Sequence, residues 1–445
     1  MEVDVRRDGG GAQQAVTLAC DTIYALSSGR PPSAIAVLRV SGPQAGPAVE
    51  ALAGHIPSPR RAALAEIRHP NTHELLDSAL LLWMPGPSSV TGEDIAELHL
   101  HGGRAVVDAV QDALAGLPGL RPAVPGEFTR RAFDNGRIDL NEAEGLADLL
   151  LAETQSQRRQ AQSAAAGELS ARLATWRQTL LDLSARAEAM IDFSDEGEVS
   201  DAGLEGLRRD AAGLADSLDA MLVSAPAERL RDGVRVVIAG PTNSGKSSLF
   251  NRLVERDAAI ASPIAGTTRD LIEAPVAIGG VPFLFVDTAG LRQSSDPIES
   301  EGVERAAAAV EGADIVLWLG EVDGAPQREE VILVHSRSDI RPGQALPRQI
   351  AVSAKTGANI AGLIGEITCR ALALLPPEGS TVVNRRQRTG IAEMASSLHY
   401  LSRSDGLIIV AEHLRVALRV CDALTGRAGV ENMLDALFAR FCLGK

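Results

Sequence analysis

Cysteine is scarce in this sequence, and no two cysteines lie close enough in the chain to suggest a shared site. Cys20, Cys369, Cys421 and Cys442 are the only four among 445 residues, and none belongs to a C-x-x-C pair. This spacing argues against a disulfide framework and against a cysteine-rich zinc site. We therefore expect a protein of the reducing cytoplasm.

Two further absences narrow the class of protein. No run of about 18 apolar residues occurs, and the first residues, MEVDVRRDGGGAQQAV, contain no apolar signal core. We expect no transmembrane helix and no membrane partner. An excess of basic residues is also absent, because 43 Lys and Arg face 58 Asp and Glu, for a net charge of −15. That balance argues against a protein that coats nucleic acid and leaves only a local RNA contact open.

The chain divides into stretches of different periodicity, which indicate a multidomain protein with α+β, all-α and α/β parts. A length of 445 residues predicts two or three domains. We expect a flexible tail at 1–16, an α+β domain at 17–135, a first helical part at 136–230, an α/β domain at 231–376 and a second helical part at 377–445.

The first helical part is marked by apolar residues at steps of three and four. Leu169, Leu173 and Trp176 begin one such stripe, and Leu204 and Leu207 begin another. Such stripes are more often the core of a bundle than a groove for a partner. The same spacing returns near residue 407, so we expect the α/β domain to be inserted into a helical domain whose two parts pack together.

The α/β domain is indicated by short, continuously apolar runs separated by helical segments. These runs are VRVVIAG, FLFVDTAG, DIVLWLG, VILVHS and QIAVSAK. Runs of this kind are typical of parallel strands buried on both faces. The runs predict a doubly wound α/β domain, and the segment GPTNSGKSS after the first run makes the expected fold a Ras-like P-loop domain.

A phosphate-binding loop follows the first of these strands. The segment GPTNSGKSS spans residues 240–248 and opens a helix. Gly240 and Gly245 let main-chain N–H groups close around phosphates, Lys246 reaches the outer two phosphates, and Ser247 holds Mg²⁺. The residues expected at the nucleotide are Asn243, Ser244, Gly245, Lys246, Ser247 and Ser248.

Two further segments predict a switch that senses the γ-phosphate. GTTRD occupies residues 266–270 and supplies Thr268, which we place on Mg²⁺ and the γ-phosphate. DTAG occupies residues 287–290, where Asp287 would bind Mg²⁺ through water and the Gly290 N–H would face the γ-phosphate. The residues of this second segment are Asp287, Thr288, Ala289 and Gly290. Both loops would be ordered by one phosphate and released on its loss.

Recognition of the base departs from the usual GTPase pattern. Where GTPases present N-K-x-D, this chain reads Ser336-Arg337-Ser338-Asp339. Asp339 remains and is expected to accept from guanine N–H groups. Ser353, Ala354 and Lys355 are expected to supply backbone donors to the guanine oxygen. Without the asparagine and the lysine, affinity for guanine becomes an open question.

The catalytic machinery also departs from Ras, which places a glutamine directly after D-T-A-G. This chain has Leu291 there, and leucine cannot hydrogen-bond a water molecule. Asn243 can offer an oxygen to a monovalent cation, and Glu299 can accept from water. Asn243 and Glu299 are therefore candidates for stabilising the charge and for orienting the attacking water in the absence of a glutamine at position 291.

From about Asp21 to Lys445 the sequence resembles the family of tRNA-modification GTPases called MnmE or TrmE. The strings that carry the resemblance are GRPPSAIAVLRVSG, MPGPSSVTGEDIAELHLHGG, PGEFTRRAFDNGRIDLNEAEGLADL, GPTNSGKSSLFN, IAGTTRD, DTAGLR and FCLGK. Each string alone is modest, but their order along the whole chain is highly specific.

The resemblance implies a potassium-activated GTPase that forms a homodimer and works with a flavin-dependent partner, MnmG. Together they would add aminomethyl or carboxymethylaminomethyl groups at C5 of the wobble uridine of certain tRNAs. Asn243 matches the family's side-chain potassium ligand, and Glu299 matches its water-orienting glutamate. The matching potassium loop is Ser262, Pro263, Ile264, Ala265, Gly266, Thr267 and Thr268, with Ser262, Ile264 and Thr267 as ligands.

The resemblance also implies an N-terminal domain that dimerises and binds 5-formyl-tetrahydrofolate or a related one-carbon folate. Arg39, Glu97, Arg137 and Lys445 fall on the family's ligand positions, although the family usually has lysine at the position of Arg137. Cys442 matches a cysteine needed for modification, which makes it a candidate reagent. Packing as a small hydrophobic residue is its alternative role.

Two other functions stay open from the residues. A ribosome-assembly GTPase of the Era kind would share the α/β domain, but it would leave the N-terminal domain and FCLGK without a role. A folate-binding scaffold with a silent G domain would account for the altered base-recognition motif. GTP turnover separates the scaffold from the two GTPases.

Overall fold

The computed structural model describes residues 21–192, 201–223, 227–255, 272–288, 307–341, 346–377, 380–402, 406–428, 431–439, 441 and 444. The predicted potassium loop, Ala289, Gly290, Glu299, Cys442 and Lys445 lie outside these residues. The chain forms two compact units, one made of Met1–Ala143 with Gly429–Lys445 and the other of Glu144–Ala428. The predicted fold class, which combines α+β, all-α and α/β parts, is confirmed.

The first unit contains a six-stranded sheet in the order β3-β4-β5-β2-β1-β6. Its strands are β1 Thr22–Leu26, β2 Ile35–Ser41, β3 Ala63–Arg68, β4 Leu75–Met84, β5 Ile95–His101 and β6 Leu120–Pro122. All neighbours pair antiparallel except β1 and β6, which are parallel. A mixed sheet of this kind is what the predicted α+β domain requires.

The two faces of this sheet carry different residues because side chains alternate along each strand. On β5, Ala96, Leu98 and Leu100 are buried in the core formed with α1 (Ala45–Ala53) and α2 (Arg104–Ala115). On the opposite face Ile23 and Ala25 of β1 pack with Phe128 of α3 (Glu127–Asp134).

The last helix, α14 (Glu431–Phe438), belongs to this first unit. Gly126 lies so close to it that a Cβ on Gly126 would stand 2.2 Å from the Phe438 carbonyl oxygen. The Phe438 ring centroid is 6.3 Å from that of Phe133, and Arg130 pairs with Asp435 at 2.6 Å. We expected residues 377–445 to form one helical part. In the structure α14 is helical, and the residues from 429 onward are grouped with the first unit, where Phe438 packs near Phe133 of α3.

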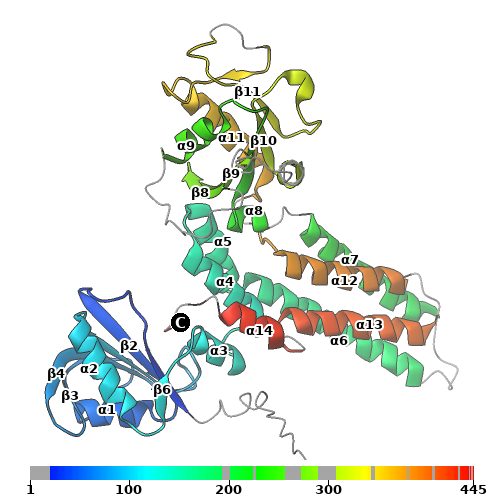
Figure 1. Cartoon of the computed structure of the whole chain (residues 1–445). Helices are drawn as coiled ribbons and strands as arrows, with labels where there is room; N and C mark the ends of the chain where they lie inside the picture. Colours follow the sequence, from blue (N-terminus) through cyan, green and yellow to red (C-terminus); the bar gives the residue numbers. More distant parts are fainter. Residues whose placement is uncertain are drawn as a thin grey trace, which may run out of the picture. The chain divides into compact units, whose positions relative to one another are not determined.

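The helical part of the second unit contains long helices around one apolar core and two shorter helices, α4 and α5, that contribute no described residue to this core. They are α4 Leu140–Leu151, which begins in the first unit, α5 Gln155–Ala165, α6 Glu168–Asp192, α7 Asp201–Leu222, α12 Arg385–Ser402 and α13 Leu407–Leu424. The core joins Leu173 and Leu207 of the earlier helices to Leu398 and Leu414 of the later ones. The expected packing between the two helical stretches is therefore confirmed, and α6, α7, α12 and α13 run side by side (Figure 1).

The α/β part has a six-stranded sheet in the order β12-β11-β10-β7-β9-β8. Its elements are α8 Glu228–Arg231, β7 Val234–Ala239, α9 Lys246–Glu255, β8 Ile272–Ile278, β9 Val281–Asp287, β10 Ile315–Trp318, η3 Val322–Gly324, β11 Val331–His335, β12 Ile350–Ala351 and α11 Ile360–Leu374. The five predicted strands are all present. Strand β8, which pairs antiparallel with β9, was not predicted.

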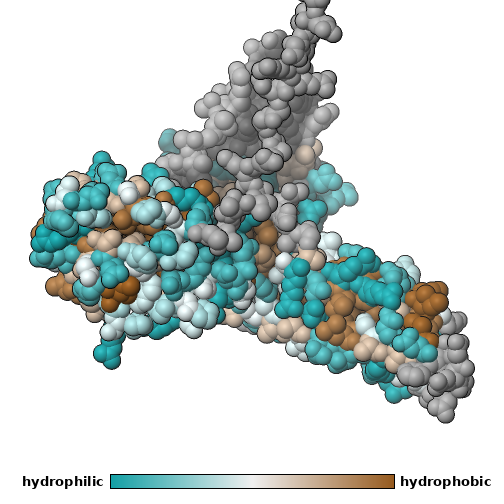
Figure 2. Space-filling view, turned by 90° about the horizontal axis from the view of Figure 1, so that it is seen from below, coloured by the Kyte–Doolittle hydropathy of each residue, from teal (hydrophilic) through white to brown (hydrophobic). Residues whose placement is uncertain are grey.

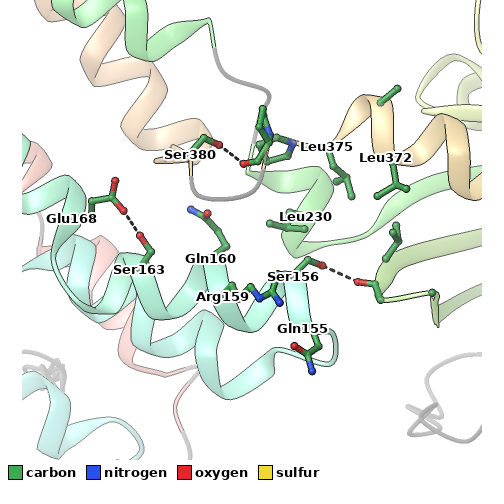
Figure 3. Close-up of a pocket in the computed structure, with 16 residues that line it drawn as sticks. Gln155, Ser156, Arg159, Gln160, Ser163, Glu168, Leu230, Leu372, Leu375 and Ser380 are labelled. Atoms are coloured by element: carbon green, nitrogen blue, oxygen red, sulfur yellow. Dashed lines mark hydrogen bonds between the residues drawn. The ribbon is translucent and has the colours of Figure 1, made fainter.

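Helix α5 contacts the α/β part directly. Its N-terminus is fixed by a capping box in which Thr154 and Gln157 bond each other's backbone N–H groups. Ser156 Oγ donates to the Gly280 carbonyl oxygen at 2.9 Å, and Gln157 Nε2 donates to the Arg231 carbonyl oxygen at 3.0 Å. Figure 3 shows Ser156 at one side of a pocket of about 830 Å³ whose other wall includes Leu230 and Leu375.

On the face seen in Figure 2, the described residues form no broad apolar band. In Figure 2 apolar residues form separate patches among hydrophilic ones. None of the helices in the described part of the chain combines the length and the apolar character that a membrane crossing requires.

Candidate functional site

Strand β7 leads into a glycine-containing loop at the carboxyl edge of the parallel sheet. Apart from half-buried Arg235, the strand is buried, as its continuous apolar run predicts. Gly240 follows with φ +146°, and a Cβ there would lie 3.1 Å from the Leu319 carbonyl carbon. Gly245 has φ +94°, which L side chains rarely adopt, and α9 begins at Lys246. Glycine is therefore required at both ends of this loop.

Polar groups of the loop are arranged for an anion. Ser244 Oγ is buried and has no hydrogen-bond partner within the part of the chain that is described. Lys246 is 7% exposed, and its Nζ donates to the carbonyl oxygens of Gly240 at 3.0 Å and Pro241 at 2.8 Å. An orphan hydroxyl, a buried ammonium and the N-terminus of α9 all favour negative charge. These residues therefore fit the phosphates of a nucleotide.

Asp287 and Thr288 lie beside this loop at the end of β9. Because β9 runs parallel to β7 with Asp287 opposite Ile238, both strands end at the same edge of the sheet. The Thr288 hydroxyl donates to the Ile238 carbonyl oxygen at 2.8 Å, and Asp287 is 1% exposed. A buried carboxylate at this place suits Mg²⁺ bound through water. No group of three or more His, Cys, Asp or Glu among the described residues forms a ready-made metal site.

The far end of the loop meets a pocket of about 240 Å³. The predicted residues Gly245, Ser248, Asp339, Ala354 and Lys355 all line it, together with Leu249, Ser336, Arg337, Ile340 and Val352. Asp339 Oδ1 accepts a hydrogen bond of 2.7 Å from Ser353 Oγ. The structure thus brings the predicted base-recognition residues next to the phosphate loop. The bond from Ser336 Oγ to the Ser244 carbonyl oxygen, at 2.5 Å, was not anticipated.

The first unit contains a second candidate site, centred on Arg39 and Glu97. The two residues are opposite each other on β2 and β5, and Arg39 donates from Nε at 3.0 Å and from Nη2 at 2.7 Å to Glu97 Oε1. Their side chains are 20% and 15% exposed. The Arg39 guanidinium lies over the Phe128 ring at 5.7 Å, and its Nη1 donates to the Gly444 carbonyl oxygen at 3.5 Å.

His99 extends this site, and sequence reasoning missed it. Its Nε2 lies 3.4 Å from Glu97 Oε2, because residues two apart on a strand share a face. The alternation in ELHLH was the signal that could have identified it. Arg137 lies beside Gly92, where its Cγ would be 3.3 Å from a Cβ on Gly92. No contact described for the structure joins Arg137 to Arg39 or Glu97.

Two arginines and three carboxylates form a network of ion pairs around α3. Arg131 pairs with Asp21 at 2.7 Å and with Glu93 at 3.1 Å, while Arg121 pairs with Glu127 at 2.5 Å. Burial raises the pKa of the Asp21 and Glu127 carboxyls. Hydrogen bonds from Arg121 and the positive charges of Arg121 and Arg131 outweigh burial and bring both pKa values below their ordinary ones. The carboxylates stay ionised, so the network holds α3 against the sheet.

Comparison with known proteins gives matches over nearly the whole chain. A family model described as the GTP-binding protein TrmE N-terminus matches residues 22–137, and one described as the MnmE helical domain matches residues 140–442. The protein named tRNA modification GTPase MnmE of Erythrobacter litoralis is 53% identical over 96% of this chain and 100% of its own length. Its namesake from Rhizorhabdus wittichii is also 53% identical, over 96% and 97%.

Among solved structures, the G domain of the T. maritima FeoB iron transporter is similar to part of this chain. It is 23% identical, and the match covers 31% of this chain and 98% of the transporter domain with a TM-score of 0.22.

Proposed function

Because this chain belongs to the MnmE family of tRNA modification GTPases, it is a GTP hydrolase of tRNA modification, and we propose that it is activated by potassium. The observation that carries nucleotide binding is the loop at 240–245, with its orphan Ser244 hydroxyl and buried Lys246, and potassium activation is proposed from the match of Asn243 in that loop. We further propose that the reaction modifies C5 of the wobble uridine of certain tRNAs, with aminomethyl or carboxymethylaminomethyl groups as products.

The chain's own residues would bind and position GTP in three places. Main-chain N–H groups of the loop and the Lys246 ammonium would hold the phosphates, which requires Lys246 to leave the carbonyl oxygens it now contacts. The Asp339 carboxylate would accept hydrogen bonds from N–H groups on one edge of guanine. Glu299 would orient the attacking water, because Leu291 cannot. Positioning and charge stabilisation account for most catalysis of phosphoryl transfer.

Two cations complete this proposal. When bound, Mg²⁺ and K⁺ supply positive charge that stabilises the charge developing on the phosphate oxygens. Ser247 and Thr268 would hold Mg²⁺, with Asp287 acting through water. Asn243 would hold K⁺ with ligands from the loop at 262–268. Asn243 is exposed and has φ 60°, so its side chain is not held in the core.

The first unit would hold the one-carbon chemistry. Arg39 and Glu97 present a positive and a negative group side by side, which fits a ligand that carries both carboxylates and N–H donors, as a folate does. Arg137 and Lys445 are proposed as further ligand contacts. Cys442, two positions before Gly444 in the sequence, is proposed as the nucleophile, and Arg39 contacts the Gly444 carbonyl oxygen.

The proposed partners are a second copy of the chain, an MnmG-like flavoprotein and tRNA, in the cytoplasm. Family membership over the whole chain argues against both alternatives. If the chain were a ribosome-assembly GTPase, it would be unexplained that relatives whose alignments cover 96% of this chain are named tRNA modification GTPases. A silent G domain conflicts with the GTPase activity of the family.

The test is GTP turnover by the full chain with Mg²⁺, measured in KCl and in NaCl at equal ionic strength. We expect turnover to be at least tenfold faster in KCl, and Asn243→Ala to lose most of this preference. Asn251→Ala is the matched control, because Asn251 is exposed on α9, away from the loop. Equal rates in both salts would overturn potassium activation. Absence of turnover in both salts would overturn GTP hydrolysis and favour the scaffold with a silent G domain.

A further inference from the structure

The hydroxyl of Ser336 donates its proton to the backbone of the phosphate loop. Its Oγ donates to the Ser244 carbonyl oxygen at 2.5 Å, which ties the segment after β11 to the loop. A hydroxyl carries one proton, whereas an amide side chain carries two N–H donors. Asparagine at this position could therefore bond the loop and also donate to a base. Ser336 has no proton left to donate to a bound purine.

Arg337 lies along the phosphate loop at the edge of the base pocket. Its Nε would stand 3.5 Å from a Cβ on Gly245, and the residue lines the pocket. The backbone there is left-handed, with φ 57°, and its carbonyl oxygen accepts from the N–H groups of Ile340 and Arg341 at 3.1 Å each. These bonds hold the turn that directs the side chain. A planar guanidinium in this place suits stacking on the flat face of a base.

Asp339 is oriented by Ser353 so that it acts as an acceptor. The Ser353 hydroxyl accepts from the Thr356 N–H at 3.2 Å, so its own proton is directed to Asp339 Oδ1 at 2.7 Å. The second carboxylate oxygen is then available to ligand donors. Guanine offers two such donors on one edge, the ring N1–H and the exocyclic amine, whereas adenine offers neither at those positions.

We propose that this chain reads guanine on one edge only. Asp339 determines base identity through the N1–H and the amine, the Arg337 guanidinium supplies affinity by stacking on the purine, and the purine N7 receives no donor from Ser336. This inference rests on the proposed GTPase function and names the residues that determine its nucleotide specificity.

The test compares base analogues on the unmodified full chain, by competition against a fluorescent GDP. We expect 7-deaza-GDP, which lacks N7, to bind within about twofold of GDP. IDP lacks the exocyclic amine and is expected to bind about tenfold more weakly, since one hydrogen bond to a charged acceptor is lost. ADP should bind weakest. If 7-deaza-GDP binds tenfold more weakly than GDP, N7 is read and the proposal is overturned.

Two variants assign the effects to residues. Arg337→Ala is expected to weaken GDP, IDP and 7-deaza-GDP by one common factor of about tenfold, because stacking does not depend on the edges of the base. Ser336→Asn is expected to create a preference for GDP over 7-deaza-GDP. Arg341→Ala serves as control, because Arg341 is exposed in the same turn and does not line the pocket.

The results distinguish failure of this base-recognition inference from failure of the proposed GTPase function. If GDP binds but Arg337→Ala matches the control, the stacking role is overturned while the GTPase assignment stands. If no guanine nucleotide competes at all, the nucleotide site itself is overturned, and this inference with it.

Discussion

The Ser27 hydroxyl donates a hydrogen bond of 3.0 Å to the carbonyl oxygen of Gly444, the penultimate residue of the sequence. Arg39 donates to the same oxygen at 3.5 Å. The backbone of the FCLGK motif is thus held at Gly444 beside the Arg39 and Glu97 pair. Residues more than 400 positions apart in the sequence meet at one candidate site.

Gly444→Ala is expected to disrupt this arrangement. Gly444 has φ +89°, and a Cβ there would lie 2.4 Å from the Leu26 carbonyl oxygen. We expect tRNA modification to fall at least tenfold while GTP turnover in KCl stays within twofold. The measurement is the content of modified uridine in tRNA by mass spectrometry. Gly29→Ala is the control, since nothing lies within 4 Å of a Cβ at Gly29. Modification at the control level would show that the fit at Gly444 is unimportant.

Phe438→Ala tests whether α14 stabilises the first unit. Phe438 is 3% exposed and packs near the Phe133 and Phe441 rings, so truncation should cost about 3–5 kcal/mol of unfolding free energy. Denaturant unfolding followed by Trp83 fluorescence, in a chain whose Trp176 and Trp318 are both replaced by Phe, is the measurement. Leu64→Ala should change little, because Leu64 is 72% exposed. A Phe438→Ala midpoint equal to that of Leu64→Ala would contradict the observed packing.

Acid should weaken the charge network at α3. The pKa values of Asp21 and Glu127 are lower in the folded protein than their ordinary values, against the effect of burial, because Arg121 and Arg131 hold the ionised forms. Their contribution to stability is therefore complete above the ordinary values of 3.8 and 4.5 and is lost as the pH falls through the lower folded values.

We expect the unfolding midpoint in denaturant to be steady from pH 7 to about pH 5 and to fall below it. Glu127→Gln should lower the midpoint at pH 7 and reduce the acid-dependent loss. Glu66→Gln is the matched control, since Glu66 is 60% exposed in its pair with Arg68. If the unfolding midpoint falls equally steeply with acid in both variants, Glu127 does not contribute to the acid-dependent loss of stability.

The described cysteines should differ in reactivity. Cys421 is buried in the helical core, where burial raises the pKa of its thiol to about 11, whereas Cys369 is exposed. At pH 8 iodoacetamide should label Cys369 and spare Cys421 until the protein is unfolded, because the thiolate is the reactive form. Peptide mass spectrometry locates the label. Rapid labelling of Cys421 in the folded protein would mean that the bundle opens there.

The phosphate loop could be predicted because its signal is local. A buried strand, glycines at fixed positions and the start of a helix are contiguous from residue 234 to residue 255. The apolar stripes of α6 and α7 are local in the same way. Strand β8 escaped prediction, since a short segment containing Pro275 carries little pattern and becomes a strand by pairing with β9.

The sequence by itself determined the long helices of the bundle, five strands of the α/β sheet and the phosphate loop, because the spacing of neighbouring residues sets backbone geometry and burial there. The tertiary structure decided which distant side chains meet. Strand register placed Arg39 opposite Glu97, close packing at Gly126 brought α14 to the first unit, and the turn after β11 set Ser336 against Ser244. Such contacts depend on how the whole chain fills space, and no local pattern of residues specifies them.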